Sequence, residues 1–156
     1  MKYKVFNIEF DGIDKSGKDS IMKQIFAYAP NKYIPKSRGL LSQIAYAHMY
    51  DRDDEYLVDD GYLSNTLFVL LTVDENDWNV RCELTHEHEI NKCRGDVERE
   101  IKYTETSNAF MYAYNKLLSM NIDPKQVMIF NTSEMTPFKI IEKVVDRLNE
   151  LNAKYN

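Results

Sequence analysis

The sequence contains little cysteine and no long apolar run. Its two cysteines cannot form the disulfide framework on which small secreted domains depend. No apolar stretch approaches the roughly 18 residues that a membrane-spanning helix requires. The first residues, MKYKVFNIEFDG, contain acids and alternate between polar and apolar, so they lack the apolar core of a signal peptide. We therefore expect a cytoplasmic protein that does not act in a membrane.

An excess of positive charge is also absent. Lys and Arg total 20 against 25 Asp and Glu, and the net charge of −5 argues against a broad basic surface for nucleic acid or anionic membrane. The first 40 residues are the exception, because they hold eight basic and four acidic residues. We therefore expect anion binding to be local, near the N-terminus, and the ligand to be small.

Internal repeats, low-complexity tracts and linkers rich in Pro, Gly or Ser are absent as well. The chain has 156 residues, of which 44% are hydrophobic and 29% charged, a composition typical of a folded protein with one core. These values predict a single domain over residues 1–156.

Short runs of β-forming residues alternate with stretches of helical periodicity. The pattern predicts five strands, over residues 4–10, 32–34, 55–59, 67–73 and 126–130. Helices are predicted over residues 18–29, 40–50, 96–120 and 137–151, the last beginning at Pro137 after the capping residue Thr136. Because strands that alternate with helices form parallel sheets, we expect an α/β fold with a five-stranded, mostly parallel sheet and helices on both faces.

The residues between the first strand and the first helix match the phosphate-binding pattern G-x-x-x-x-G-K. The match runs from Gly12 to Lys18 (GIDKSGK). In such a loop the backbone N–H groups point at phosphate oxygens, the following helix adds its positive N-terminal end, and the lysine bridges the outer phosphates. The motif predicts a P-loop NTPase fold that binds ATP and Mg²⁺, with the nucleotide held by Gly12, Ser16, Gly17 and Lys18.

The residue after the motif departs from the usual pattern. Asp19 stands where a Ser or Thr hydroxyl normally holds Mg²⁺. A carboxylate is also a hard oxygen ligand for the metal, but it brings negative charge toward the phosphates, and Ser20 offers a hydroxyl one residue later. Asp19 and Ser20 are therefore the candidate ligands of Mg²⁺ and ATP here. Alternatively, Asp19 only interacts favourably with the helix N-terminus.

The run from Phe10 to Ser20 (FDGIDKSGKDS) resembles the opening of thymidylate kinase-like enzymes, whose first strand ends in a phrase like EGIDGSGK. The resemblance implies ATP-dependent phosphorylation of a deoxynucleoside 5′-monophosphate, dTMP or a related pyrimidine nucleotide. It also implies that Asp14 lies near the sugar of this acceptor and that Lys15 helps to neutralise the transferred phosphoryl group.

Two shorter segments resemble substrate-binding segments of the same family. Residues 34–39 (IPKSRG) resemble a loop that contacts the acceptor monophosphate, which makes Arg38 its partner. Residues 57–62 (LVDDGY) resemble an Asp-Arg-aromatic segment, although no Arg follows Asp59 or Asp60. The resemblance implies that Asp59, Asp60 and Tyr62 bind substrate. Asp59 is also a candidate ligand of Mg²⁺, because it ends a predicted strand beside the P-loop.

A polar segment in the middle of the chain resembles the family's lid, over residues 82–94. Arg81 and Arg94 flank it, and together with Lys15 and Lys18 they could stabilise the charge that develops during phosphoryl transfer. The segment also contains four potential zinc ligands, Cys82, His86, His88 and Cys93. The glutamates between them favour a solvated helix over a zinc site. Near the C-terminus, Asn131 and Thr132 resemble the adenine-side loop.

Three further questions stay open at this point. The acceptor could be an unphosphorylated deoxynucleoside, or Asp19 and the missing Arg near Asp60 could mark a weakened nucleotide-binding or regulatory module. The base is undetermined, although Tyr46, Tyr62 and Tyr112 could stack on one. Members of the family are commonly dimers, so the resemblance allows a homodimer.

Overall fold

The computed structural model describes residues 4–28, 32–52, 59–84 and 96–155. Within these ranges the chain forms one parallel sheet of four strands: β1 (Asn7–Gly12), β2 (Ile34–Ser37), β3 (Thr66–Thr72) and β4 (Val127–Asn131). Their spatial order is β2-β1-β3-β4, and all three pairings are parallel. β3 reads TLFVLLT with almost no polar side chain, because helices cover both of its faces.

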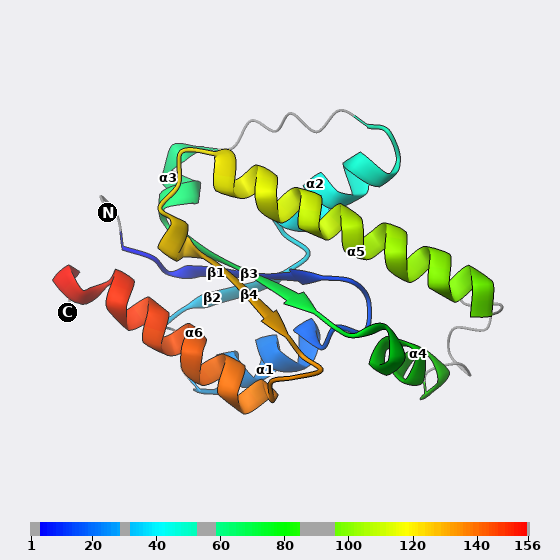
Figure 1. The fold of residues 1–156 in the computed structure, drawn as a ribbon. Helices are drawn as coiled ribbons and strands as arrows, with labels where there is room; N and C mark the ends of the chain where they lie inside the picture. The colour runs from blue at the N-terminus through cyan, green and yellow to red at the C-terminus, as the bar shows by residue number, and fades with distance from the viewer. Residues whose placement is uncertain (1–3, 29–31, 53–58, 85–95, 156) are drawn as a thin grey trace.

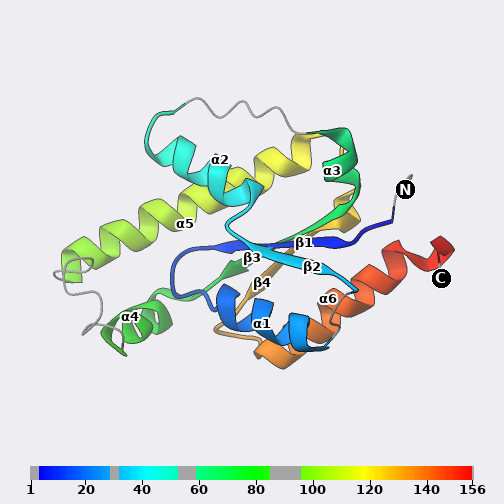
Figure 2. The ribbon, with the colours of Figure 1, turned by 180° about the vertical axis from the view of Figure 1, so that it is seen from behind.

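Two helices pack on each face of the sheet (Figures 1 and 2). The pair α1 (Lys18–Tyr28) and α6 (Pro137–Leu151) covers one face, and α2 (Leu40–Met49) and α5 (Asp96–Ser119) cover the other. Each pair has its own apolar core, and Ile8 and Phe10 of β1 contribute to the one beneath α1 and α6. As the sequence predicts, Thr136 caps α6 through a bond from Lys139 N. No helix in the described ranges is both long and apolar enough to cross a bilayer.

The two remaining α-helices lie at opposite ends of the strands. The short helix α3 (Asp60–Ser64) precedes β3, and α4 (Glu75–Leu84) follows it (Figure 1). The strand register fixes this separation, because Asn7 at the start of β1 pairs with Thr66, whereas Gly12 at its end pairs with Leu71. Two short 3-10 helices, η2 (Pro124–Gln126) and η3 (Ala153–Tyr155), precede β4 and follow α6. Whatever binds at the end of β1 is therefore close to α4 and far from α3.

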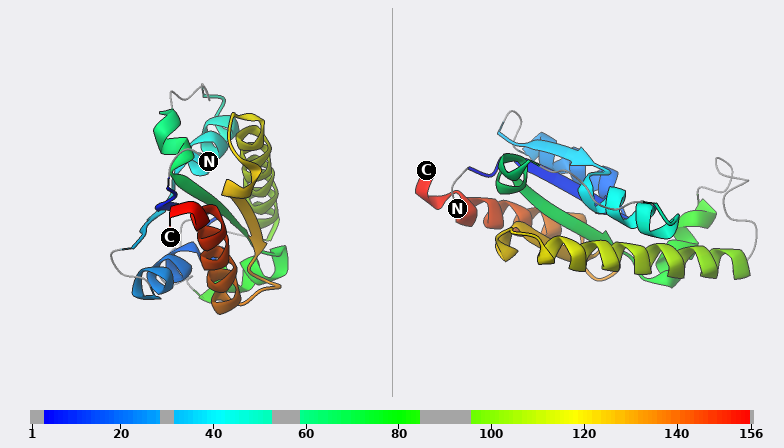
Figure 3. Two further views of the ribbon diagram at one scale, coloured as in Figure 1. Left: turned by 90° about the vertical axis from the view of Figure 1, so that its left-hand side faces the viewer. Right: turned by 90° about the horizontal axis from the view of Figure 1, so that it is seen from above.

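The chain just before β1 and the end of α6 lie close together, on the side of the sheet away from α4 (Figure 3). Asn152, which is buried, accepts a hydrogen bond from Val5 N at 2.7 Å and donates one to Val5 O at 2.8 Å. The side-chain amide of Asn152 thus pairs with the chain before β1 as a neighbouring strand would.

The expected five-stranded sheet is not what the described residues form. The predicted strand over 32–34 lies at 34–37 instead. Most of the strand predicted over 55–59 lies outside the described residues, and Asp59 is the N-cap of α3 rather than a strand end. The first strand is also displaced, to residues 7–12, so Asp11 and Gly12 belong to the sheet and not to the loop.

Candidate functional site

The phosphate-loop motif forms a tight turn between β1 and α1, as the sequence predicts. Gly12 has a φ of 157°, and a Cβ there would lie 2.3 Å from Leu71 O on the neighbouring strand. Gly17 has a φ of 93°, and Lys15 adopts a left-handed φ of 69° that non-glycine residues rarely take. Both glycines therefore allow a positive φ, but only at Gly12 does the close approach of β3 also leave no space for a Cβ.

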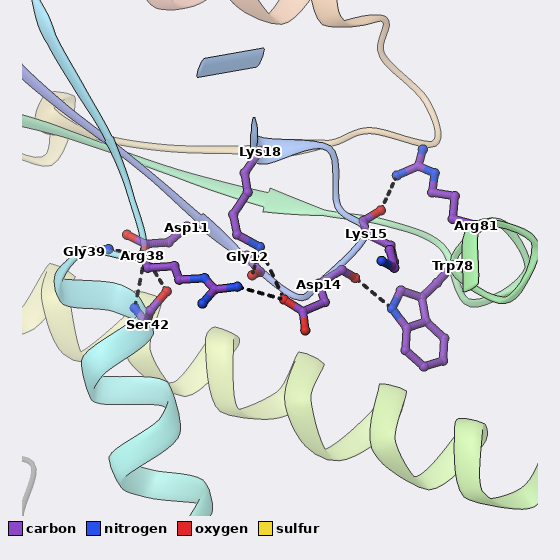
Figure 4. Close-up of polar contacts among 10 residues, drawn as sticks. All are labelled: Asp11, Gly12, Asp14, Lys15, Lys18, Arg38, Gly39, Ser42, Trp78 and Arg81. Carbon is purple, nitrogen blue, oxygen red and sulfur yellow. Dashed lines mark hydrogen bonds and ion pairs between the residues drawn. The ribbon is translucent and has the colours of Figure 1, made fainter. Parts of the chain in front are cut away.

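Lys18 begins α1 and folds back over the loop. Its side chain is almost fully buried, and Nζ donates to Gly12 O at 3.2 Å and lies 3.7 Å from Asp14 Oδ1 (Figure 4). A buried ammonium needs such partners, because an unpaired charge away from water is costly. The motif thus holds a positive charge inside the curve of its own backbone.

A cavity of about 310 Å³ opens beside the loop at the N-terminus of α1. It is lined by three basic side chains, two acids and the first turn of the helix: Asp14, Lys15, Gly17, Lys18, Asp19, Ser20 and Arg38. The basic side chains and the N–H groups at the helix start favour an anion. The structure therefore brings together the P-loop residues that the sequence predicts, and Arg38 with them.

Asp14 lies between Lys18 and Arg38. Its Oδ1 is 3.7 Å from Lys18 Nζ and 4.0 Å from Arg38 Nη2, and its side chain is 43% exposed (Figure 4). Arg38, by contrast, is 73% exposed, so most of its guanidinium remains open to a ligand. One half-exposed acid therefore faces both the P-loop lysine and the arginine predicted to bind an acceptor.

Asp14 also lines a second and larger cavity, of about 740 Å³, between α2, α4 and α5. Apolar and aromatic side chains provide most of its wall, with a few polar groups: Ile13, Tyr46, Met49, Tyr50, Trp78, Ile101, Lys102, Glu105 and Thr106. Tyr46 stacks on Tyr50 with ring centroids 6.4 Å apart, and burial, followed by the charge of Asp14, raises the pKa of the Tyr46 hydroxyl. This pocket can accommodate a planar ring.

Of the aromatic residues predicted to stack on a base, only Tyr46 lines this cavity. Tyr112 stacks on His48 at 3.8 Å, and Tyr62 lies in α3. The wall residues from α2, α4 and α5 other than Tyr46 were not predicted, because these three helices are far apart in the chain.

Trp78 connects α4 to the phosphate loop. Its Nε1 donates to Asp14 O at 2.8 Å, and its buried ring lies 5.6 Å from that of Tyr103. Tyr103 in turn donates its hydroxyl to Val73 O at 2.6 Å. The indole bond holds the backbone of Asp14, and nothing in the motif itself indicates it.

Arg81 contacts the P-loop backbone and the adenine-side loop together. Its Nη1 donates to Lys15 O at 2.7 Å (Figure 4). Nη1 also donates to Thr132 Oγ1 at 3.1 Å, and Nη2 donates to Thr132 O at 3.5 Å. Asn131 donates to Asp74 Oδ1 at 2.8 Å and accepts from Ser133 N at 2.9 Å. The structure therefore links Arg81 and Thr132 to the P-loop, whereas Asn131 bonds to Asp74 and Ser133.

Two carboxylates that the sequence analysis did not single out lie beneath this site. Glu9 and Asp11 on β1 are 1% and 0% exposed, on the strand face toward α2. Burial is the main cause that raises the pKa of each carboxyl group, and hydrogen bonds from the start of α2 partly counteract it. The alternation NIEFD is the sequence signal for them, because it places Glu9 and Asp11 on the face opposite Ile8 and Phe10.

The structure does not bring the other predicted substrate residues to this site. Asp59, Asp60 and Tyr62 belong to α3 or its cap, at the edge of the sheet where β3 begins, and Asp59 Oδ1 accepts from Gly61 N at 2.6 Å. This position also removes Asp59 as a partner of Asp19 and Ser20 in holding Mg²⁺. The reason is that the segment caps a helix before β3 instead of ending a strand beside β1.

The predicted lid is only partly within the described residues. Cys82 and its two successors belong to α4, and Cys82 packs in a buried cluster with Ile13, Val73 and Trp78. His86, His88, Cys93 and Arg94 lie outside the described ranges. Within those ranges no group of three or more His, Cys, Asp or Glu side chains is arranged to hold a metal.

Comparisons with known proteins agree with this geometry at the level of the fold. No family model and no curated protein matches the sequence. Two solved structures match: the YorR protein of Bacillus subtilis, described in complex with phosphorylated GDP, and thymidylate kinase of Candida albicans. Each is 12% identical to this chain.

The YorR match has a TM-score of 0.66 and covers 96% of this chain and 99% of that one. The thymidylate kinase match has a TM-score of 0.54 and covers 98% and 94%. Together with the P-loop at the end of β1, these likenesses show that the chain has a P-loop kinase fold of the thymidylate kinase-like type.

Proposed function

We propose that this protein is a nucleoside monophosphate kinase that transfers the γ-phosphoryl group of ATP to a deoxynucleoside 5′-monophosphate. The observation that carries the proposal is the position of Asp14, which lines both the basic cavity of the P-loop and the aromatic cavity. A donor in the first and an acceptor in the second would meet at this residue. The likeness of the fold to thymidylate kinase, and to a protein described with a guanine nucleotide, supports a nucleotide as substrate.

The donor half of the site consists of the P-loop and the first turn of α1. Lys18 and the loop N–H groups would bind the β- and γ-phosphates, and Lys15 adds a second positive charge at the cavity wall. Asp19 and Ser20 are exposed, line the same cavity and offer hard oxygen atoms, so they fit a Mg²⁺ ion that otherwise takes phosphate and water ligands. When bound, Mg²⁺ would neutralise charge on the phosphates.

The acceptor half consists of Arg38, Asp14 and the aromatic cavity. Phosphoryl transfer needs alignment of the two reactants and stabilisation of the charge on the transferred group, and little covalent participation by the protein. The exposed guanidinium of Arg38 can form a two-pronged contact with a phosphate, and the cavity wall around Tyr46 would enclose the base. Asp14 would orient the sugar between them.

The test is ADP release with ATP, Mg²⁺ and a panel of deoxy- and ribonucleoside monophosphates. We expect turnover with at least one deoxynucleotide, and loss of ATP binding and turnover in Lys18→Ala. Lys139→Ala is the matched control, because Lys139 lies in the first turn of another helix, α6, and is paired with Glu142 at the surface. Absence of turnover with every acceptor, or a Lys18→Ala variant that behaves like wild type, would overturn the proposal.

The exposed charge of Arg38 favours a monophosphate over an unphosphorylated nucleoside as acceptor. We expect Arg38→Ala to raise the KM for the monophosphate by about 100-fold, the value of a lost charged hydrogen-bond pair, and to leave the KM for ATP nearly unchanged. A deoxynucleoside kinase would show turnover with nucleosides that does not depend on Arg38. ATP binding without any turnover would instead identify a nucleotide-binding module.

A further inference from the structure

Arg38 adopts a backbone conformation that it would not take by itself. Its φ is 59°, in the left-handed region, which costs a residue with a Cβ about 1–2 kcal/mol. Its side chain is mostly exposed, so packing of the side chain does not compensate for this cost. The residues on either side must therefore hold the backbone in place.

Hydrogen bonds to β1 hold the chain on both sides of Arg38. Arg38 N donates to Phe10 O at 3.3 Å, and the next N–H group, of Gly39, donates to Asp11 Oδ1 at 2.7 Å (Figure 4). Leu40 N donates to Glu9 Oε1 at 2.7 Å. Ser42 adds its backbone N, at 3.3 Å, and its hydroxyl, both to Asp11 Oδ1. The first turn of α2 is therefore bound to two carboxylates of the central strand.

These carboxylates replace the side-chain cap that α2 lacks. The N-cap residue is Gly39, which has no side chain to accept a bond from the helix N–H groups. The N–H groups of this first turn and the positive end of the helix in turn offset the cost of burying two negative groups. A Cβ on Gly39 would lie 1.9 Å from Glu9 Oε1, so the close approach requires glycine at this position.

The anchored start of α2 is connected directly to the P-loop site. Arg38 directly precedes the anchored turn, and its guanidinium reaches 4.0 Å from Asp14 at the mouth of the basic cavity. Asp11 directly precedes Gly12, so the same strand that supports Arg38 carries the phosphate loop. A shift of the α2 start relative to β1 would move Arg38 relative to the P-loop.

We propose that Glu9 and Asp11 are positioning residues of the acceptor site, which hold the start of α2 on β1 so that Arg38 faces the acceptor's phosphate. This inference rests on the proposed function, because it assumes that Arg38 binds the acceptor. Ser42 helps to hold the start of α2 on β1 through its hydroxyl bond to Asp11. Glu9 and Asp11 do not touch substrate; they act through Arg38.

The first test separates acceptor binding from ATP binding. We expect Glu9→Gln and Asp11→Asn to raise the acceptor KM about tenfold, and Ser42→Ala about threefold, because each loses one or more charge-assisted bonds to the start of α2. The KM for ATP should stay within about twofold in each variant, since none of these bonds involves the phosphate-binding loop itself. Gly39→Ala should reproduce the effect of Glu9→Gln, because the added methyl group displaces the Glu9 carboxylate.

The matched control is Asp123→Asn. Asp123 also accepts a backbone N–H bond, from Lys125 at 2.9 Å, but it caps η2 at the surface before β4. Its variant should keep wild-type KM values for both substrates. Circular dichroism and thermal unfolding identify any variant that fails to fold, and Ser42→Ala, which removes one hydroxyl group, keeps the test possible if Asp11→Asn does not.

A double-mutant cycle with Arg38→Ala decides whether the effect passes through Arg38. If it does, Asp11→Asn and Glu9→Gln raise the acceptor KM in the wild-type background and change it less than twofold in the Arg38→Ala background. Equal effects in both backgrounds, or equal losses of ATP and acceptor binding, would overturn the inference and leave the proposed function intact. If Arg38→Ala alone leaves the acceptor KM unchanged, the assignment of the acceptor site fails, and the inference with it.

Discussion

Trp78 of α4 donates its indole N–H to the backbone carbonyl of Asp14, the residue that faces both Lys18 and Arg38. The bond is 2.8 Å long, and the indole ring is 1% exposed. Because Trp78 is the only tryptophan in the chain, its fluorescence reports on the phosphate loop and the adjoining cavity alone. The backbone of Asp14, which follows β1, is thus held by α4, the helix that follows β3.

We expect Trp78→Phe to weaken both folding and ATP binding. The variant leaves the partly buried carbonyl of Asp14 without its donor, a loss of about 1 kcal/mol in the free energy of unfolding, and it frees the loop on one side. Urea unfolding and calorimetric titration with ATP measure the two effects. Tyr103→Phe is the control, because it removes a similar bond, to Val73 O, without touching the loop. It should lower stability and leave ATP affinity unchanged; equal ATP affinity in both variants would contradict the prediction.

We expect Arg81→Lys to raise the KM for ATP by about tenfold. Lysine keeps the charge, but it has no second nitrogen to replace the bond from Nη2 to Thr132 O and no planar fork to hold its donors in place, so the connection between the two loops weakens. Steady-state kinetics with ATP as the varied substrate measure the change. Arg147→Lys is the matched control, because Arg147 Nη1 also donates to a backbone carbonyl, Lys125 O, at 2.7 Å on the surface of α6. An unchanged KM in Arg81→Lys would show that the link has no role in nucleotide binding.

The two glycines of the loop should respond differently to substitution by alanine. Gly12→Ala places a methyl group 2.3 Å from Leu71 O, so β1 and β3 must separate, and we expect a loss of more than about 3 kcal/mol of stability. In Gly17→Ala the added methyl group meets no atom within 4 Å. This variant should lose only about 1–2 kcal/mol of stability, the cost of a positive φ at alanine. Denaturant unfolding of both variants measures the difference. Equal losses would indicate that backbone strain alone decides both positions.

The buried carboxylate of Glu9 should make stability depend on pH. Burial raises its pKa above the ordinary value of 4.5, so the folded chain binds this proton more tightly than the unfolded chain does. Its contribution is therefore complete below pH 4.5 and is lost as pH rises through the raised pKa of the folded state. Glu9→Gln lacks this loss, so the melting temperature of the variant relative to wild type should rise between pH 4 and pH 7.

The control for this pH dependence has the opposite sign. Lys125, through a hydrogen bond and its charge, lowers the pKa of the exposed Glu150, so this contribution is present at neutral pH and lost on acidification. Glu150→Gln should therefore lose stability relative to wild type at pH 7 and approach it at pH 4. If Glu9→Gln followed the same trend as Glu150→Gln, burial would not be the dominant influence on Glu9.

The elements that were predicted correctly have strong local signals. The first strand and the phosphate loop follow from alternation that ends in a glycine motif, and β3 follows from a run that is apolar throughout. Pro137 after Thr136 marks the start of α6, because both residues favour a helix N-terminus on their own. Such features depend on a few neighbouring residues, so the sequence suffices to place them.

The features that were missed depend on contacts between distant segments. β2 reads IPKS, which has a proline and two polar residues, and only its pairing with β1 makes it a strand. The role of Glu9 appears only when the start of α2 lies on β1, and the aromatic cavity needs three helices. The expectation for Asp59 was wrong in position because the segment resembles a strand end but caps a helix at the other edge of the sheet.

Pro35 limits the hydrogen bonds that the outer edge of β2 can offer to another strand. Among the described residues β2 pairs with β1 alone, and Ile34 N and Arg38 N point inward, to Phe6 O and Phe10 O. The outward donor positions of this short strand are therefore 35 and 37, and proline has no N–H to offer at the first of them. With exposed Lys36 between them, the outer edge of β2 keeps Ser37 N as its outward donor, which disfavours the addition of another strand there.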